Sequence, residues 1–215
     1  MKKVFSIAAL VLLVLFIGFT GLFNQNENKQ SSVGSLNQTN ADKVTVGIIQ
    51  YMEHVALDSA REGFIAALQE NGYVEGENLT IDLQNAQGDQ SNLSTISDRF
   101  VNNQVDLVLA IATPAAQSIA GKTTEIPILA TAVTDFVSAK LVDTVEAPGG
   151  NVSGTTDMNP IKEQIDLLVK LAPKAKTIGV LYTSSEDNSV LQARLAKEAI
   201  EKLGLSYVEV TVTNS

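Results

Sequence analysis

The chain has 215 residues, of which 45% are hydrophobic, and a net charge of −9. Because it contains no cysteine and only one histidine, it cannot form disulfides, thiolate metal sites, cysteine nucleophiles or zinc sites built from several histidines. The acidic balance and the lack of a basic stripe argue against nucleic-acid binding, while the hydrophobic fraction is sufficient for a folded core.

An uncharged apolar stretch, residues 4–23, follows Lys2 and Lys3. Its length is about that needed to span a bilayer as a helix, and the two lysines favour a cytoplasmic N-terminus with the rest of the chain exported. We therefore expect residues 1–23 to anchor the protein at the extracytoplasmic face of a bacterial cell membrane. A cleaved secretory signal is the competing interpretation, under which the protein is secreted, although a cleavage site of small residues is hard to find.

A polar segment rich in Asn, Gln and Ser, residues 24–42, is typical of a flexible spacer. Beyond it, apolar runs typical of buried parallel strands alternate with segments of helical periodicity. The expected order is strand 44–50, helix 57–71, strand 79–83, helix 92–101, strand 105–112, helix 114–120, strand 126–132 and helix 137–145. After Pro148, Gly149 and Gly150 come strand 152–155, helix 160–171, strand 177–182, helix 190–203 and strand 206–213.

This alternation predicts an α/β fold of parallel sheets with helices on both faces. The pattern restarts near residues 151–157, and Asn159 is expected to be the N-cap of the next helix. We infer an N-terminal lobe over residues 43–157 and a C-terminal lobe that begins at residue 158. Residues 158–215 supply too few elements to complete a second core, so the second lobe is expected to be incomplete in this chain.

Ligands of parallel α/β sheets lie beyond the carboxyl ends of the strands, which selects the candidate binding residues. After the third strand, Thr113 is expected to be an N-cap and Pro114 the first helical residue. The small side chains of Ala115 and Ala116 would leave backbone N–H groups open to a carboxylate. The alternative is that Thr113 and Pro114 only begin a helix.

Two further groups of candidates follow the next two strands. Thr131 and Thr134 could donate hydrogen bonds, and Asp135 could neutralise an ammonium group, unless it caps the helix expected near residue 136. At the restart come Thr155 and Asp157. Asp157 is slightly favoured over Asp135 as the ammonium partner, because Asn159 already serves as the cap of the following helix.

The remaining candidates follow the first strand and the first strand of the second lobe. Gln50, Tyr51 and His54 could form one wall of an aromatic pocket, with Gln50 at its polar end. Alternatively, Tyr51 packs under a loop and His54 is a surface residue. Tyr182 and Ser184 are expected to face the same cleft from the second lobe. Aromatic residues just past strand ends suit stacking on a flat apolar ligand. Because the aromatic residues are few, chance alone can also produce this placement.

Signals of catalysis and of cofactor binding are weak. The sequence has no G-x-S-x-G motif, no glycine-rich phosphate loop of the common types and no carboxylate–histidine set at metal-ligand spacing. We therefore expect a binding protein rather than an enzyme, without a cofactor or a metal.

Five stretches carry a resemblance to a known family. VGIIQYMEHVALDSAREGF, LAIATPAAQSIA, PILATAVTDFVSAKLV, GGNVSGTTDMNPIKEQIDLL and IGVLYTSSEDNS, in this order, closely resemble ABC-transporter substrate-binding proteins of the tryptophan/tyrosine type. These have the type I periplasmic-binding-protein fold. The resemblance implies two α/β lobes joined by a hinge, which close on a small ligand, and a longer chain. The sequence departs from the lipoprotein pattern of many such binders because it lacks the anchoring cysteine.

The residues and the resemblance together predict a membrane-tethered solute receptor that presents an aromatic amino acid, similar to tryptophan, tyrosine or phenylalanine, to an ABC permease. The ligand carboxylate is expected at the N–H groups after Thr113, the ammonium at Asp157 or Asp135, and the ring near Tyr51 and Tyr182. The main alternative is the ligand-binding ectodomain of a membrane sensor. An enzyme on the same scaffold ranks last, because no acid–base pair is visible.

Overall fold

The computed structural model describes residues 43–213. A parallel five-stranded sheet lies at the centre of residues 43–157, which we call the first lobe. Its strands are β1 (Val44–Gln50), β2 (Leu79–Asn85), β3 (Leu107–Ile111), β4 (Ile128–Val133) and β5 (Val152–Thr156). They lie in the order β2-β1-β3-β4-β5, and every neighbouring pair is parallel. The strand order changes direction between β1 and β3, the place where doubly wound sheets bind ligands beyond their carboxyl ends.

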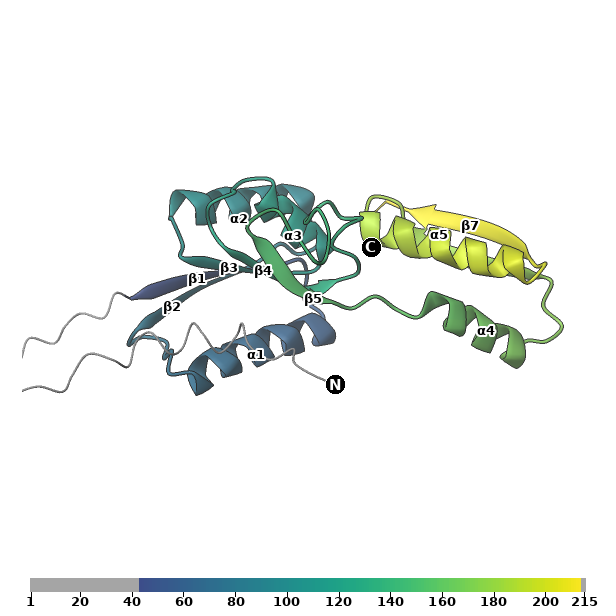
Figure 1. Cartoon of the computed structure of the whole chain (residues 1–215), viewed down its shortest axis with the longest axis horizontal. Helices are drawn as coiled ribbons and strands as arrows, with labels where there is room; N and C mark the ends of the chain where they lie inside the picture. Colours follow the sequence, from purple (N-terminus) through teal and green to yellow (C-terminus); the bar gives the residue numbers. More distant parts are fainter. Residues whose placement is uncertain (1–42, 214–215) are drawn as a thin grey trace, which may run out of the picture. The chain divides into compact units, whose positions relative to one another are not determined.

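Helices cover both faces of this sheet, with α1 on one side and α2 and α3 on the other (Figure 1). They are α1 (Val55–Glu70), α2 (Gln90–Asn102) and α3 (Thr113–Ala120). Successive residues of β1 point to opposite faces, so Ile48 lies in the core under α1 and Ile49 in the core under α2 and α3. The predicted arrangement of helices on both faces is therefore confirmed for this sheet.

Gly47 in β1 allows α2 to approach the sheet closely. A Cβ atom at this position would lie 2.8 Å from the ring of the fully buried Phe100. Any side chain here would displace the phenylalanine, because interiors are close-packed.

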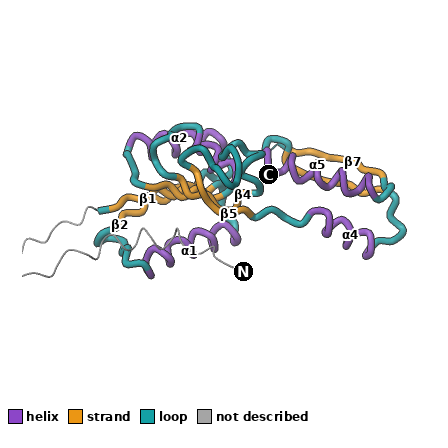
Figure 2. The backbone as a smooth tube through the Cα atoms, viewed as in Figure 1, coloured by secondary structure: helices purple, strands orange, loops and turns teal. Residues whose placement is uncertain are grey.

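Residues 158–213, which we call the second lobe, are built on a two-stranded parallel sheet. Its strands are β6 (Thr177–Thr183) and β7 (Ser206–Val212), and its helices are α4 (Ile161–Leu171) and α5 (Asp187–Lys202). Figure 2 shows α5 alongside β7, and α4 packs against α5. The core of this lobe contains the buried side chains of Ile165, Ile178, Ala196 and Ile200.

Most expected elements are present, with ends that differ by a few residues. Helix α1 begins at Val55 and α5 at Asp187, both before the positions that the apolar spacing indicates. Gly72, with φ of +85°, follows the C-cap residue Asn71, a position where glycine commonly ends a helix. The expected cap of α4 is wrong: Pro160 occupies the N-cap position, and Asn159 donates instead from Nδ2 to Gln192 Oε1 at 3.2 Å.

The helix expected over residues 137–145 is also wrong. The chain forms only one turn, in which Ala139 N–H donates to Asp135 O and Leu141 N–H to Phe136 O. Lys140, with φ of +58°, ends this turn in the left-handed conformation. The next residues form a loop in which Asp143 N–H donates to Pro148 O at 2.9 Å.

Residues 1–42 lie outside the described part of the chain, and so do the predicted anchor, residues 1–23, and spacer, residues 24–42. Within residues 43–213, the helices are all too short or too polar to span a bilayer.

Candidate functional site

The carboxyl ends of the strands bring the loops of the first lobe to one edge. Three backbone hydrogen bonds connect these loops: Tyr51 N–H donates to Ile111 O at 3.2 Å, Ala112 N–H to Thr131 O at 3.0 Å and Asp157 N–H to Val133 O at 3.0 Å. The candidates that follow β1, β3, β4 and β5 therefore lie along a single edge, as the parallel topology predicts.

Two residues at this edge have an unusual backbone conformation. Ala112, which precedes α3, has φ of +86°, and Ala132 at the end of β4 has φ of +54°. The pairing of β4 with β5 also shifts register between Ala130 and Val133. Alanine in the left-handed region is strained, and such strain is concentrated at functional sites. The sequence gives no signal for either conformation.

The N-terminus of α3 lacks a side-chain cap. Ala112 rather than Thr113 occupies the N-cap position and makes no side-chain hydrogen bond, so the predicted capping role of Thr113 is wrong. Thr113 is instead the first helical residue and is 2% exposed. Its Oγ1 is buried and has no hydrogen-bond partner among residues 43–213. Pro114, Ala115 and Ala116 are also buried, which makes this helix end tightly enclosed by small side chains.

The threonines of β4 and β5 form a polar ladder. Thr131 Oγ1 lies 3.0 Å from Thr155 Oγ1, and Thr156 Oγ1 donates to Thr134 O at 2.6 Å. Thr134 is itself buried. The structure thus brings Thr131 and Thr155 together and pairs Thr134 with Thr156, although none of these bonds requires a ligand.

The two candidate carboxylates differ in their surroundings. Asp135 Oδ1 accepts a hydrogen bond from Ser138 N–H at 2.6 Å, and this bond holds the pKa of Asp135 below its ordinary value. Asp135 therefore caps the single turn after β4, as the capping interpretation predicts, and it also lines a pocket of about 170 Å³ with Phe136. The Asp157 side chain is exposed and makes no hydrogen bond to residues 43–213.

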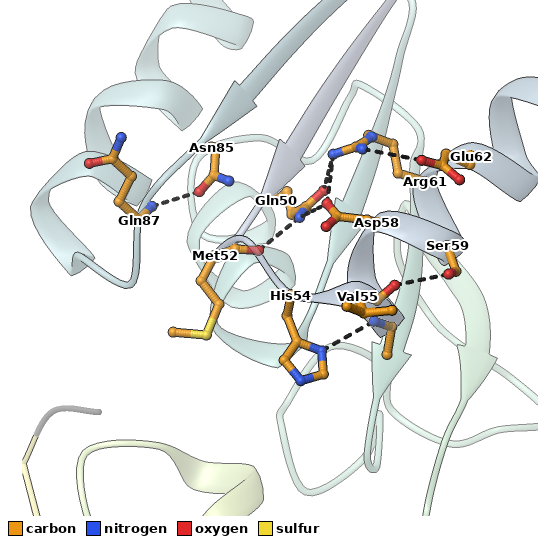
Figure 3. A network of polar contacts seen from close by, with 11 residues as sticks. Gln50, Met52, His54, Val55, Asp58, Ser59, Arg61, Glu62, Asn85 and Gln87 are labelled. Carbon is orange, nitrogen blue, oxygen red and sulfur yellow. Dashed lines mark hydrogen bonds and ion pairs between the residues drawn. The ribbon is translucent and has the colours of Figure 1, made fainter.

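Gln50 belongs to a partly buried polar network with α1, in which its side chain, Asp58 and Arg61 point toward one another (Figure 3). Its Nε2 donates to Met52 O at 2.7 Å and to Asp58 Oδ1 at 2.9 Å, and its Oε1 accepts from Arg61 Nη1 at 2.9 Å. Arg61 also pairs with Asp58 at 3.0 Å. Gln50 is 0% exposed, so these contacts support a structural role for its amide rather than one at the polar end of a pocket.

Tyr51 and His54 both have structural partners. Tyr51 is 9% exposed and packs in the core under α2 and α3. Its hydroxyl lies 3.2 Å from both Gly88 O and Glu186 Oε1, and burial followed by the charge of Glu186 raises its pKa. His54 is the N-cap of α1, where its Nδ1 accepts from Ala56 N–H at 3.2 Å. These contacts agree with the interpretation of Tyr51 as a packed residue under the loop and of His54 as a surface residue.

The candidates of the second lobe bond within their own sheet. Tyr182 donates from its hydroxyl to Glu209 Oε2 at 3.3 Å, and Ser184 donates from N and from Oγ to Val212 O. In the described part of the chain, no hydrogen bond joins Thr113, Asp157 and Tyr182. A groove of about 430 Å³ between α4 and α5 is larger than the pocket at Asp135, but it contains none of the predicted binding residues.

Sequence reasoning missed several side chains that connect the lobes, namely Gln117, Glu186, Asp187 and Gln192. Gln117 Nε2 donates to Asp187 Oδ2 at 2.9 Å, and Gln192 Nε2 lies 3.5 Å from Thr134 Oγ1. Such contacts depend on the packing of distant segments, for which one sequence has no local signal.

The chain is similar to proteins of one known family. A family model described as ABC transporter substrate binding protein matches residues 45–215. A tyrosine-binding protein of Clostridioides difficile is 40% identical over 214 residues, a match that covers 100% of this chain and 61% of the relative. The chain therefore spans about three fifths of the length of this relative.

Two solved structures are also similar and cover much of the chain. The ABC domain of Streptococcus pneumonia in complex with L-Trp is 42% identical with a TM-score of 0.76, over 80% of this chain and 58% of that one. The ligand-free, open structure of a substrate binding protein with adhesive properties from Clostridium difficile is 48% identical with a TM-score of 0.61, over 79% of this chain and 58% of that one. The chain thus belongs to the family of ABC transporter substrate-binding proteins.

Proposed function

We propose that this protein is the extracytoplasmic solute-binding component of an ABC importer and that it binds an aromatic amino acid between its two lobes. Family membership supports the transport role. The relatives named for tyrosine binding and solved with L-Trp support an aromatic ligand. The predicted anchor, residues 1–23, would hold the protein beside its permease at the membrane.

The main structural support for a bound ligand comes from the N-terminus of α3. It lies at the carboxyl edge of β3, lacks a side-chain cap and presents the buried, unpaired hydroxyl of Thr113. A buried polar group without a partner costs free energy, so it indicates a missing partner. A carboxylate suits this position because helix N-termini attract anions and a hydroxyl can donate to one.

For the ligand ammonium we propose Asp157 rather than Asp135. The carboxylate of Asp135 already accepts a backbone hydrogen bond, whereas that of Asp157 is free of bonds to residues 43–213. Asp157 also follows β5 directly, next to the threonine ladder. For the ring, the partly exposed Tyr182 is a better candidate than the buried Tyr51, because only a ring with an accessible face can stack on a ligand.

Calorimetry on the purified protein tests the ligand. L-tyrosine, L-tryptophan and L-phenylalanine should be compared with tyramine, which lacks the carboxylate, and with 3-(4-hydroxyphenyl)propionate, which lacks the ammonium. At a hundredfold excess over Kd, a true ligand should stabilise the protein by ~2.7 kcal/mol. If none of the three amino acids gives heat or raises the melting temperature, the proposal is wrong.

Asp157→Asn tests the ammonium contact. Because a hydrogen bond to a charged group contributes ~1.5–3 kcal/mol, this variant should weaken L-tyrosine binding by roughly tenfold or more. Binding of 3-(4-hydroxyphenyl)propionate should not change. Asp98→Asn, an exposed carboxylate on α2 that pairs with Lys122, is the matched control and should bind as the wild type does. Equal affinities of wild type and Asp157→Asn for L-tyrosine would exclude Asp157.

Cell fractionation tests the proposed location. The full chain should be recovered with the membrane and be accessible to protease from outside the cytoplasm, and deletion of residues 2–23 should leave it in the cytoplasm. Recovery of the full chain in the cytoplasmic fraction would contradict the anchor.

A further inference from the structure

Three side chains near the start of α5 contact the first lobe. Glu186 Oε1 lies 3.2 Å from the hydroxyl of Tyr51, and Asp187 Oδ2 accepts from Gln117 Nε2 at 2.9 Å. Gln192 Nε2 lies 3.5 Å from Thr134 Oγ1 and its Oε1 accepts from Asn159 in the segment that connects the lobes. The contacts of Glu186 with Tyr51, of Asp187 with Gln117 and of Gln192 with Thr134 join different lobes, so they exist only while the two lobes are together.

The donors of the two stronger contacts are already positioned by the first lobe. Tyr51 is buried and its hydroxyl also lies 3.2 Å from Gly88 O, while Gln117 Nε2 also donates to Ala139 O at 3.2 Å. The acceptors, in contrast, are carboxylates at the N-terminus of α5, where negative charge is favoured by the helix dipole. Little side-chain entropy is therefore lost when donors and acceptors meet.

We infer that the lobe arrangement in this structure is the closed one, and that Tyr51, Gln117, Glu186 and Asp187 form a latch that stabilises it without binding the ligand. In this arrangement each carboxylate accepts a hydrogen bond from the opposite lobe. The inference rests on the proposed function for the identity of the ligand. A ligand that binds between the lobes is held by the closed form, so its apparent affinity scales with the closed fraction.

The latch makes Tyr51 a positioning residue. Its predicted task was to face the ligand ring, but its ring is packed in the core and its hydroxyl points to α5. A latch of this kind sets affinity independently of ligand chemistry, since it contributes equally for every ligand that requires closure.

Distance measurement between the lobes tests the latch without any ligand. The chain contains no cysteine, so cysteines introduced as Ser91→Cys on α2 and Lys170→Cys on α4 can be spin-labelled uniquely. In the ligand-free protein, Asp187→Ala and Gln117→Ala should each lower the population of the short, closed distance severalfold. Glu198→Ala, which removes an exposed carboxylate of α5 that pairs with Arg194, should not. Distance distributions of both variants that equal the wild type would overturn the inference.

A double-mutant cycle shows whether Gln117 and Asp187 act as one unit. Each single variant should weaken L-tyrosine binding by about fivefold to tenfold, and the double variant should lose no more than a single one, because the partners share one bond. Additive losses would contradict the pair.

The ammonium-free analogue separates the latch from a direct ligand contact. If Asp187 bound the ligand ammonium, Asp187→Ala would weaken L-tyrosine but not 3-(4-hydroxyphenyl)propionate; the latch requires the same loss for both. A wild type that binds no aromatic amino acid would contradict the proposed function, whereas the ligand-free distances would still decide the latch.

Discussion

The hydroxyl of Thr113 is buried without a partner in the described part of the chain, whereas that of Thr156 donates to Thr134 O at 2.6 Å. The two threonines lie at the same edge of one sheet and differ in whether the hydroxyl is paired. This contrast allows the cost of an unsatisfied group to be measured within one protein.

Replacement of each threonine by valine should have opposite effects on stability. Thr113→Val removes an unpaired polar group and should raise the free energy of unfolding of the ligand-free protein by ~1 kcal/mol, whereas Thr156→Val breaks a bond and should lower it by ~1 kcal/mol. Urea unfolding followed by circular dichroism measures both. If Thr113 serves a ligand carboxylate, the more stable variant should also bind L-tyrosine more weakly. A destabilised Thr113→Val would contradict an unpaired hydroxyl.

The phenol of Tyr207 has a raised pKa, which a titration can test. Burial, followed by the hydrogen bond to Glu209 at 3.0 Å, raises the pKa of Tyr207 from 10.0 to about 12. A raised folded-state pKa favours the neutral phenol, so its contribution to stability is present below the ordinary pKa and is lost as the pH rises from about 10 through about 12. Absorbance at the phenolate band should show a late titration step.

Two variants check the assignment of that step. Tyr207→Phe should remove it, and Glu209→Gln should move it to lower pH, because the acceptor charge is lost. A late step that persists in Tyr207→Phe would show that another tyrosine causes it.

Helix α1 contains one glycine, Gly63, and a second, Gly72, follows its C-terminal end in a different conformation. Gly63 is exposed in the middle of the helix, and a Cβ atom added there would meet no other atom within 4 Å, whereas Gly72 follows the helix with φ of +85°. Neither position is crowded, so a difference between them reports backbone conformation alone.

Alanine should therefore stabilise at one glycine and destabilise at the other. Gly63→Ala should raise the free energy of unfolding by ~0.5–1 kcal/mol through helix propensity. Gly72→Ala should lower it by ~1 kcal/mol, because a Cβ atom disfavours the left-handed conformation. Chemical denaturation of the two variants and the wild type measures both, and equal signs would contradict the geometry of the helix end.

The same elements show what could be predicted from the sequence. β1 and β6 are apolar, β-branched runs, and their strand character follows from the local pattern. The helix expected over residues 137–145 fails because its apolar spacing does not reveal that Lys140 adopts φ of +58°. The edge that holds Thr113 and Asp157 follows from topology alone, but the strain at Ala112 and the bond from Gln117 to Asp187 depend on tertiary packing.

The two lobes have separate cores, and these cores differ in how completely they are covered. β1 and β3 are central strands covered on both faces. β6 and β7 form a separate pair of strands, and their side chains Leu181, Val208 and Val210 are exposed in the part of the chain that the structure describes. Two-stranded sheets are marginal by themselves, so local stability should differ between the lobes.

Hydrogen exchange should reveal this difference. Amides of β1 and β3 should exchange most slowly, and those of β7 faster. Ile200→Ala, which removes a fully buried side chain of the second core, should destabilise that lobe by ~2–5 kcal/mol and accelerate exchange in β6 and β7, without affecting β1 and β3. Equal acceleration in both sheets would show that the lobes unfold as one unit.

The order of the strands has a consequence for synthesis. All five strands of the first sheet come from residues that precede 157, and the second sheet begins only at Thr177. A nascent chain that leaves the ribosome N-terminus first can therefore assemble this sheet before β6 and β7 have been translated. During that interval Tyr51 can already reach Gly88, and only later does the growing polypeptide supply Glu186.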